Sequence, residues 1–331
     1  MKLKPLQVIS AMVIGIVVAI GCVQKSGNRN TNANDKAATT PLKDSIWQAP
    51  AINADKELNN DEKKLIQYGQ DLIAHTAKYL GPKGTVAQIS NGMNCQNCHL
   101  DAGTRLWGNN FSAVAATYPQ FRKRSNSVQG IYDRINGCME RSMNGRTIDS
   151  NTHEMKAMHA YLKWVGKGVP KGEKPKGAGL PVPAYLTRAA SPQKGKEVYT
   201  SVCQACHGVN GGGQLNGDQT EYIFPPLWGP HSYNDGAGLY RIGSFAAFVK
   251  NNMPFNVASY QHPILTDEQA WDVAAYVNSQ PRPHKDQKRD WPDMSQKPID
   301  YPFGPYTDSF SEKQHKYGPF QPIAAAQKNK I

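Results

Sequence analysis

CQNCH at residues 95–99 and CQACH at residues 203–207 are two copies of the pattern C-x-x-C-H. Two cysteines at this spacing lie on one helical turn and can form thioethers to the same porphyrin, while the histidine that follows can bind its iron. Thioredoxin-like redox sites and zinc sites also use C-x-x-C, but a histidine directly after both copies favours haem. The sequence therefore predicts two covalently bound haem c groups, held by Cys95, Cys98, His99, Cys203, Cys206 and His207.

Residues 1–22 have the pattern of an export signal. Lys2 and Lys4 precede an apolar run, LQVISAMVIGIVVAIG, which is short for a membrane-spanning helix and has the length typical of a signal peptide. The run ends in AIGC, so Cys22 stands where a bacterial lipoprotein is cleaved and lipidated; ordinary cleavage and an uncleaved anchor are the alternatives. Residues 23–54 are polar, as in a flexible tether. These features predict a periplasmic protein with a lipid anchor through Cys22.

The length and charge of the chain limit the number of domains and the kinds of partner that it can have. A chain of 331 residues suits two modest domains with extensions. The formal net charge of +12 favours an anionic substrate or partner. Nucleic acid is the common partner of basic proteins, but the sequence holds no recognition motif for it and the export signal argues against it. We therefore expect no nucleic-acid partner.

The second haem site has a candidate for its other axial ligand. Met253 stands before Pro254 in NNMPFN, and a helix is predicted shortly afterwards with Thr266 as its N-cap and an acidic first turn. This arrangement is similar to the C-terminal half of class I cytochromes c, in which a Met-Pro loop precedes the final helix. A methionine that only fills the core is the alternative interpretation.

An internal repeat indicates the matching ligand in the first half of the chain. Tyr276, in the predicted final helix, lies 23 residues beyond Met253. Tyr161 has the same setting in MKAMHAYLKWVG, and the residue 23 positions before it is Cys138. A thiolate at this ligand position would lower the potential of the first haem. An inert thiol or a disulfide with Cys22 are alternatives for this cysteine, and the competing ligands are Met143, His153 and His159.

Basic residues are concentrated around Cys138 in the sequence. If residues 128–143 form a helix, then Arg134, Arg141 and Ser142 share a face with this cysteine. Guanidinium groups bind tetrahedral oxyanions through paired, charge-assisted hydrogen bonds. A solvated basic face is the alternative interpretation of any one of these arginines. The bases between positions 121 and 146 are Arg122, Lys123, Arg124, Arg134, Arg141 and Arg146.

Longer stretches are more specific than C-x-x-C-H: MNCQNCHLDAGT, FRKRSNSVQGIYDRINGCMERSMNG, AYLKWVGKGVP and the tail DYPFGPYTDSFSEKQHKYGPFQPI. Through them, over about residues 55–325, the chain resembles the di-haem thiosulfate dehydrogenases, which form tetrathionate. The resemblance implies that Cys138 is the distal ligand of the active-site haem. It also implies a thiosulfate pocket lined by Arg124, Arg134 and Ser142. Some members carry a lysine just before the methionine that can replace it on the second iron. Asn252 stands there in this chain, which favours steady His/Met ligation.

The resemblance implies an enzyme that joins two thiosulfate anions into tetrathionate and passes electrons to an external acceptor such as a small cytochrome c. The same site would reduce tetrathionate if the relative potentials favoured that direction. A soft thiolate at Cys138 can take up sulfane sulfur, with outer-sphere oxidation as the alternative mechanism. Three other classes remain in competition: a non-enzymatic electron shuttle, a di-haem peroxidase, and a sulfur-oxidation cytochrome that loads a carrier protein.

The expected fold is mostly α. We expect two class I cytochrome c-like domains joined by a linker, with an irregular C-terminal tail that wraps around both domains. The predicted boundaries are residues 55–165 for the domain with the active-site haem, 166–184 for the linker, 185–282 for the domain with the electron-transfer haem, and 283–331 for the tail rich in proline and aromatic residues.

Overall fold

The structure is a computed structural model that describes residues 46–328. The predicted signal segment with Cys22 and most of the predicted tether therefore lie outside the described residues. No helix within residues 46–328 has both the length and the apolar character needed to cross a bilayer.

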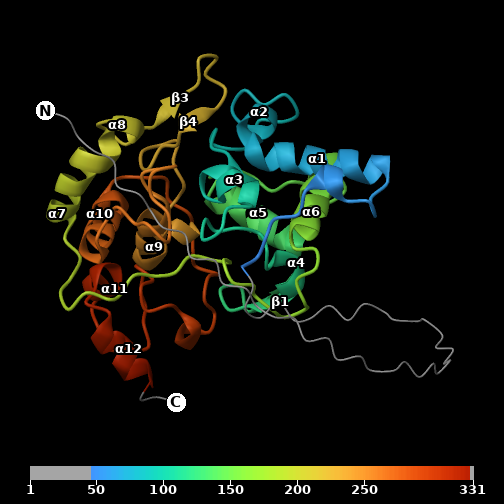
Figure 1. Ribbon diagram of the computed structural model, residues 1–331. Helices are drawn as coiled ribbons and strands as arrows, with labels where there is room; N and C mark the ends of the chain where they lie inside the picture. Colours follow the sequence, from blue (N-terminus) through green and yellow to red (C-terminus); the bar gives the residue numbers. More distant parts are fainter. Residues whose placement is uncertain (1–45, 329–331) are drawn as a thin grey trace, which may run out of the picture. The chain divides into compact units, whose positions relative to one another are not determined.

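Short helices dominate the described residues, as predicted, and the strands form only two small antiparallel hairpins (Figure 1). The first part of the chain holds α1 (Asn60–Ala74), α2 (Thr76–Leu80), α3 (Leu100–Gly103), α4 (Val114–Thr117), β1 (Gln120–Arg122), β2 (Ser127–Gln129), α5 (Ile131–Arg141) and α6 (His153–Val165). The second part holds α7 (Pro192–Val198), α8 (Gln204–His207), β3 (Gln214–Leu215), β4 (Tyr222–Phe224), α9 (Ile242–Asn252), α10 (Asp267–Ser279), α11 (Glu312–Tyr317) and α12 (Gln321–Lys328).

The two halves are built around the same kind of helix crossing. In the first half α1 packs on α6, and a Cβ added at Gly69 would lie only 2.1 Å from a carbonyl oxygen of α6. In the second half α7 packs on α10, and a Cβ at Gly195 would lie 1.9 Å from a carbonyl oxygen of α10. Only glycine permits so close an approach. The nearest side chains at the two crossings are Tyr161 and Tyr276, the pair that the sequence repeat identifies as equivalent.

Polar caps fix where α6 and α10 begin, the two helices that carry Tyr161 and Tyr276. The Thr152 hydroxyl accepts a hydrogen bond from the Met155 amide at the start of α6. Thr266 accepts one from the Gln269 amide at the start of α10, so the predicted N-cap is confirmed. Each cap satisfies a backbone donor that the helix itself cannot.

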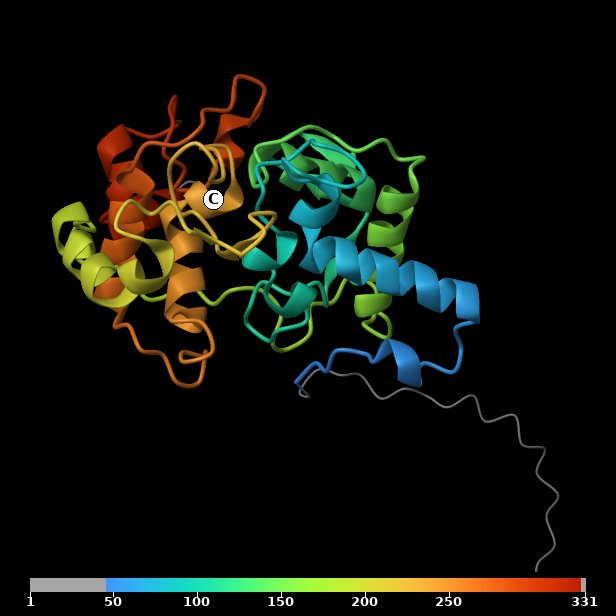
Figure 2. The same cartoon turned by 90° about the horizontal axis from the view of Figure 1, so that it is seen from above.

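Each half has its own hydrophobic core. Leu72 and Tyr161 lie fully buried in the first core, and Trp271 lies fully buried in the second. The C-terminal segment adds Phe320 and Ile323 to the second core. In Figure 2 this segment, coloured red, lies beside the orange helices of the second half.

The C-terminal segment also reaches the first half of the chain. The Trp291 amide donates a hydrogen bond to the Arg124 carbonyl at 2.7 Å. The segment therefore contacts both halves, as predicted for a wrapping tail, although it includes the short helices α11 and α12.

The helix that carries Cys138 is shorter than expected. A helix over residues 128–143 was the hypothesis behind the shared face, but α5 runs from Ile131 to Arg141 and residues 127–129 form strand β2. Gly130 is the N-cap, and its amide donates to the Asp133 carboxylate at 2.8 Å. This cap starts the helix after the hairpin, so the residues before it pair as strands instead.

Candidate haem and oxyanion site

The second C-x-x-C-H motif lies where α7 continues through one turn of π-helix into α8. The ring of His207 makes a 2.9 Å hydrogen bond from Nδ1 to the Pro225 carbonyl, which leaves Nε2 as the free nitrogen. Burial lowers the pKa of His207 and so favours the neutral ring. A neutral imidazole oriented by a backbone acceptor is the usual form of an iron ligand.

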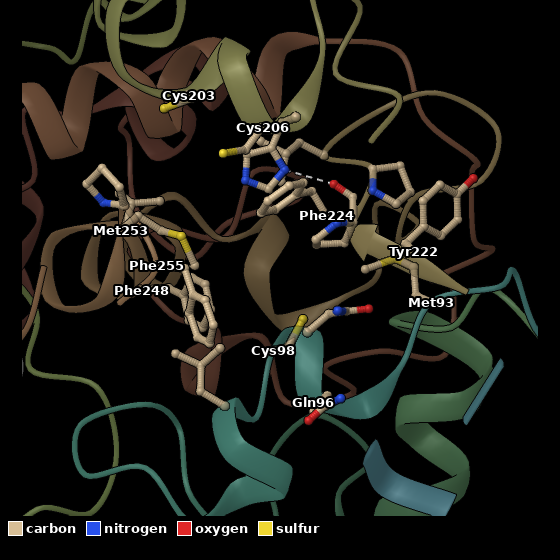
Figure 3. Close-up of a pocket in the computed structure, with 18 of the residues that line it drawn as sticks. Met93, Gln96, Cys98, Cys203, Cys206, Tyr222, Phe224, Phe248, Met253 and Phe255 are labelled. Atoms are coloured by element: carbon tan, nitrogen blue, oxygen red, sulfur yellow. Dashed lines mark hydrogen bonds between the residues drawn. The ribbon is translucent and has the colours of Figure 1, made fainter. Parts of the chain in front are cut away.

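A cavity of about 720 Å³ lies beside this histidine. Cys203, Cys206, His207 and Met253 all line it, and Cys98 of the first motif also contributes to its wall (Figure 3). The rest of the lining is mainly apolar and includes Phe245, Phe248, Val249, Leu265 and Val273. The size and apolar lining suit a porphyrin, and the donors suit an iron with one imidazole and one thioether ligand.

The first C-x-x-C-H motif starts with a turn of 3-10 helix at Cys95–Asn97. Nδ1 of His99 bonds the Asn109 carbonyl at 2.6 Å, and the ring packs on Phe111 at a centroid distance of 4.5 Å. The two histidines thus have the same kind of backbone anchor. The first motif therefore fits the same type of covalently attached haem.

Cys138 differs electrostatically from the other cysteines of the first half. Burial raises the pKa of Cys95 to about 11 and that of Cys98 to about 12. Burial acts in the same direction on Cys138, but the charge of Arg134, the nearby ring of His99 and the charge of Arg124 outweigh it and lower its pKa to about 6. Cys138 is therefore the thiolate among these cysteines at neutral pH, and thiolate is the form that binds metals and attacks sulfur.

Two of the predicted pocket arginines act on this thiolate together. The negative charge of Cys138 raises the pKa of Arg134, although burial opposes this effect. Burial and the neighbouring charge of Arg141 lower the pKa of Arg124 to about 10, so it remains charged at neutral pH. The fold thus brings His99 to Cys138, Arg134 and Arg124, which come from one stretch of the sequence.

Arg124 is held in place by groups that the sequence reasoning missed. Its Nη1 donates to the Gly236 carbonyl at 3.0 Å, and its Nε lies 3.9 Å from the Asp290 carboxylate. Its guanidinium lies 5.6 Å from the centroid of the Trp291 ring. These partners lie more than 100 positions away in the chain. The one local pattern that marks any of them is KRDWP, in which Asp290 follows two basic residues.

The other predicted residues have varied surroundings. Arg141, at the end of α5, pairs through its Nη2 with Asp290 at 2.8 Å. Ser142 is the C-cap of α5, one turn after Cys138. The competing ligands have packing partners: Met143 is buried in the first core, His153 stacks on Tyr68 and His159 contacts Tyr132.

Some buried donors also suit an acidic prosthetic group. Within the described residues, Trp107 Nε1 and Arg282 Nε are buried side-chain donors without an acceptor. Such groups are costly unless a partner is supplied. The carboxylates that a haem carries are acceptors of the kind that these donors need.

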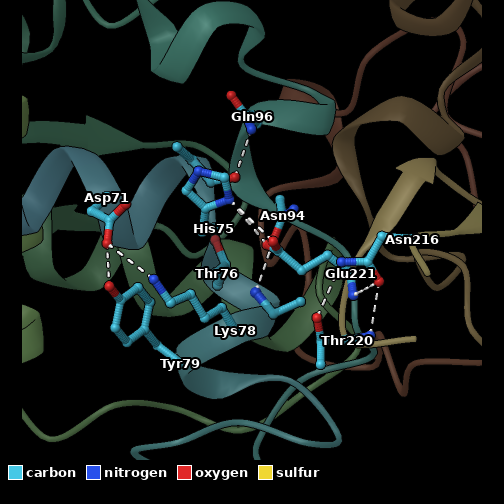
Figure 4. Close-up of polar contacts among 12 residues, drawn as sticks. Asp71, His75, Thr76, Lys78, Tyr79, Asn94, Gln96, Asn216, Thr220 and Glu221 are labelled. Carbon is cyan, nitrogen blue, oxygen red and sulfur yellow. Dashed lines mark hydrogen bonds and ion pairs between the residues drawn. The ribbon is translucent and has the colours of Figure 1, made fainter. Parts of the chain in front are cut away.

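The cavity wall is shared between the two halves of the chain. His75, from the turn between α1 and α2, pairs with Glu221 at 3.1 Å, and both residues line the cavity (Figure 4). Nearby, Lys83 Nζ donates to the Asp218 carbonyl at 3.4 Å. The cavity of the second motif is therefore closed in part by the first half.

Comparisons with known proteins agree with two haem domains in tandem. Residues 85–170 match the family described as SoxA/TsdA, cytochrome c domain, and residues 192–281 match the family described as Cytochrome c. The thiosulfate dehydrogenase of Psychrobacter arcticus is 36% identical over 264 residues, which cover 78% of this chain and 77% of that protein. The thiosulfate dehydrogenase of Stutzerimonas stutzeri is 38% identical over 66% of this chain and 68% of its own length.

A solved structure has the same fold. The thiosulfate dehydrogenase TsdBA of Marichromatium purpuratum, in its as-isolated form, matches with a TM-score of 0.66 and 32% identity. The match covers 73% of this chain and 50% of that one, so this chain spans half the length of the solved protein. The predicted fold of two cytochrome c-like domains, each with a covalently bound c-type haem, is confirmed.

Proposed function

Because this chain belongs to the thiosulfate dehydrogenase family, we propose that it joins two thiosulfate anions into tetrathionate and passes the electrons to an external acceptor. The observation that carries the proposal is the thiolate of Cys138, which lies with the charges of Arg134 and Arg124 beside His99. A protein that only transfers electrons has no need of an oxyanion pocket at one of its iron sites.

In this proposal Cys138 takes up sulfur and the arginines hold the anions. Two thiosulfate dianions repel each other, and fixed cations in a partly dry pocket offset that repulsion. The charges of Arg134 and Arg124 both act on Cys138, which supports this role for them. Ser142, at the end of the same helix, is a further candidate for contact with the anion.

The reaction balances without a proton. The sulfur of Cys138 forms a bond to the sulfane sulfur of the first thiosulfate, and two electrons leave the pair. The second thiosulfate then attacks that sulfane sulfur, so tetrathionate departs and the Cys138 thiolate is restored. When bound, the two haems supply one-electron redox chemistry that matches the two electrons released.

The second domain is the proposed exit for electrons. His207 and Met253 would hold its haem, and a thioether ligand gives a higher potential than a thiolate. Exposed apolar side chains surround the cavity, among them Ile223, Phe255 and Val257. Such a surface suits transient contact with a small redox protein, and we propose a small cytochrome c as the acceptor.

The site also supports a reverse activity and a cellular location. Since each step above is reversible, the same residues would reduce tetrathionate when a strong donor supplies electrons. The predicted signal segment and the nature of the substrate support a periplasmic location, with Cys22 as the proposed point of lipid attachment.

Purified di-haem protein tests the proposed function. With thiosulfate and a one-electron acceptor, we expect tetrathionate to accumulate in a ratio of one per two electrons, measured by anion chromatography and acceptor reduction. The reverse assay uses tetrathionate with a reduced donor dye. If both assays fail while a chemical reductant still reduces both haems, the protein is an electron shuttle.

A further inference from the structure

The loop that carries Met253 is held by the other domain. This loop, residues 253–260, follows α9 and contributes Met253, Phe255 and Asn256 to the cavity wall. Arg105 and Trp107 of the first domain contact this loop, and they lie a few residues after the first C-x-x-C-H motif.

Arg105 contacts the loop in two ways, through a hydrogen bond and through a cation–π contact of its guanidinium group. Its Nη2 donates to the Asn256 side chain at 2.7 Å, and its guanidinium lies 4.5 Å from the centroid of the Phe255 ring. The same guanidinium is fixed from behind by Asp101, with Nε 2.7 Å from a carboxylate oxygen. An arginine with this many partners has little freedom, so it can hold the loop in one position.

Trp107 binds the two ends of the loop. Its carbonyl accepts a hydrogen bond from the buried Asn252 side chain at 3.0 Å, next to Met253 in the chain. Its indole packs on Tyr260 with ring centroids 4.5 Å apart. Trp107 also has φ of +57°, which is unfavourable for a bulky side chain and is retained only where the surroundings enforce it.

We propose that Arg105 and Trp107 are positioning residues for Met253: the first domain holds the loop so that the methionine sulfur faces the cavity as the sixth ligand of the second haem. The inference rests on the proposed function, because it concerns the haem through which electrons leave. It also gives Asn252 a role, since its side chain anchors the loop to Trp107 instead of offering a second ligand.

A spectroscopic test separates this role from a general role in stability. Ferric haem bound to methionine sulfur has a characteristic long-wavelength charge-transfer band, which is read in the purified di-haem protein. We expect Arg105→Ala and Trp107→Ala to lose most of this band and to shift the potential of the second haem downwards, because thioether ligation raises it. Tyr260→Phe keeps an aromatic ring on Trp107 and should retain the band.

Lys83→Ala is the matched control. Lys83 also crosses between the domains, but it contacts the β3–β4 turn at Asp218 and not the Met253 loop. The band should persist in this variant. An unchanged band in both alanine variants, an equal loss in Lys83→Ala, or a wild-type protein without the band would each overturn the inference. Tetrathionate formation by the wild type is assayed separately, so the proposed function can stand when the inference fails.

Discussion

Asp290 Oδ1 lies 2.8 Å from Arg141 Nη2, and this pair joins the C-terminal segment to the helix that carries Cys138. The same carboxylate lies 3.9 Å from Arg124, and Gly236 of the second domain accepts hydrogen bonds from both arginines. The oxyanion pocket of the first domain is thus supported by the second domain and by the tail.

Asp290→Asn should destabilise the protein, because it leaves the guanidinium groups of Arg124 and Arg141, which are 23% and 17% exposed, without their acidic partner. The arginines are partly exposed, so we expect a loss of about 2 kcal/mol in the free energy of unfolding, less than for a fully buried pair. Denaturant titration measures the loss. Asp286→Asn removes an exposed carboxylate from the same segment and should leave stability unchanged; equal losses in the two variants would show that the pair with Arg141 is not responsible.

Arg124→Ala should weaken thiosulfate binding while both haem spectra stay the same. The loss of one charge-assisted contact raises the thiosulfate concentration for half-maximal rate by about tenfold or more. Steady-state kinetics measure the change. Arg122, two residues earlier in strand β1, has no assigned place in the pocket, and Arg122→Ala serves as the control. Normal thiosulfate binding in Arg124→Ala would place the pocket elsewhere.

The second domain depends on a buried ion pair. Asp272 is 4% exposed and pairs with Arg188 at 2.8 Å. Arg188→Ala should lower the free energy of unfolding by about 3 kcal/mol, because it leaves the buried carboxylate of Asp272 without its cationic partner. Glu268 also pairs with Arg188 but is 64% exposed, so Glu268→Gln should cost under about 1 kcal/mol. Similar costs for the two variants would contradict this assignment. Unfolding followed by haem absorbance compares them.

Met253→Gly should change the potential of the second haem and slow electron transfer to the acceptor. Thiosulfate binding should remain close to normal, because Met253 is assigned to the cavity of the second motif and not to the Cys138 pocket. Redox titration and thiosulfate-induced changes in the first haem spectrum measure the two effects. A collapse of thiosulfate affinity would contradict the division of labour between the domains.

Local patterns predicted the haem motifs and the main helices well. The C-x-x-C-H pattern by itself indicates covalent haem attachment, and the Thr266 cap with its acidic first turn marks the start of α10. The 23-residue offset that indicated Cys138 starts from Tyr161 and Tyr276, and both tyrosines lie at a close glycine crossing, at Gly69 and at Gly195.

Long-range contacts left no such signal. Asp290 and Gly236 are brought to Arg124 by the packing of the tail and of the second domain, and no periodic pattern marks them. The hold of Arg105 and Trp107 on the Met253 loop was also missed. In the same way, helical spacing placed Arg141 on the face of Cys138 but gave no indication of its ion pair with Asp290 of the tail.

The central claim is that Cys138 supplies the thiolate that takes up sulfur, and its most direct test is the rate of tetrathionate formation by Cys138→Met. Methionine can replace the lost ligand but has no thiolate to form an adduct. Both haems should be retained, because their attachment uses Cys95, Cys98, Cys203 and Cys206. We predict that tetrathionate formation falls to near the background level, as in Cys138→Gly. Near-normal turnover by Cys138→Met would contradict covalent catalysis and leave Cys138 with redox tuning alone.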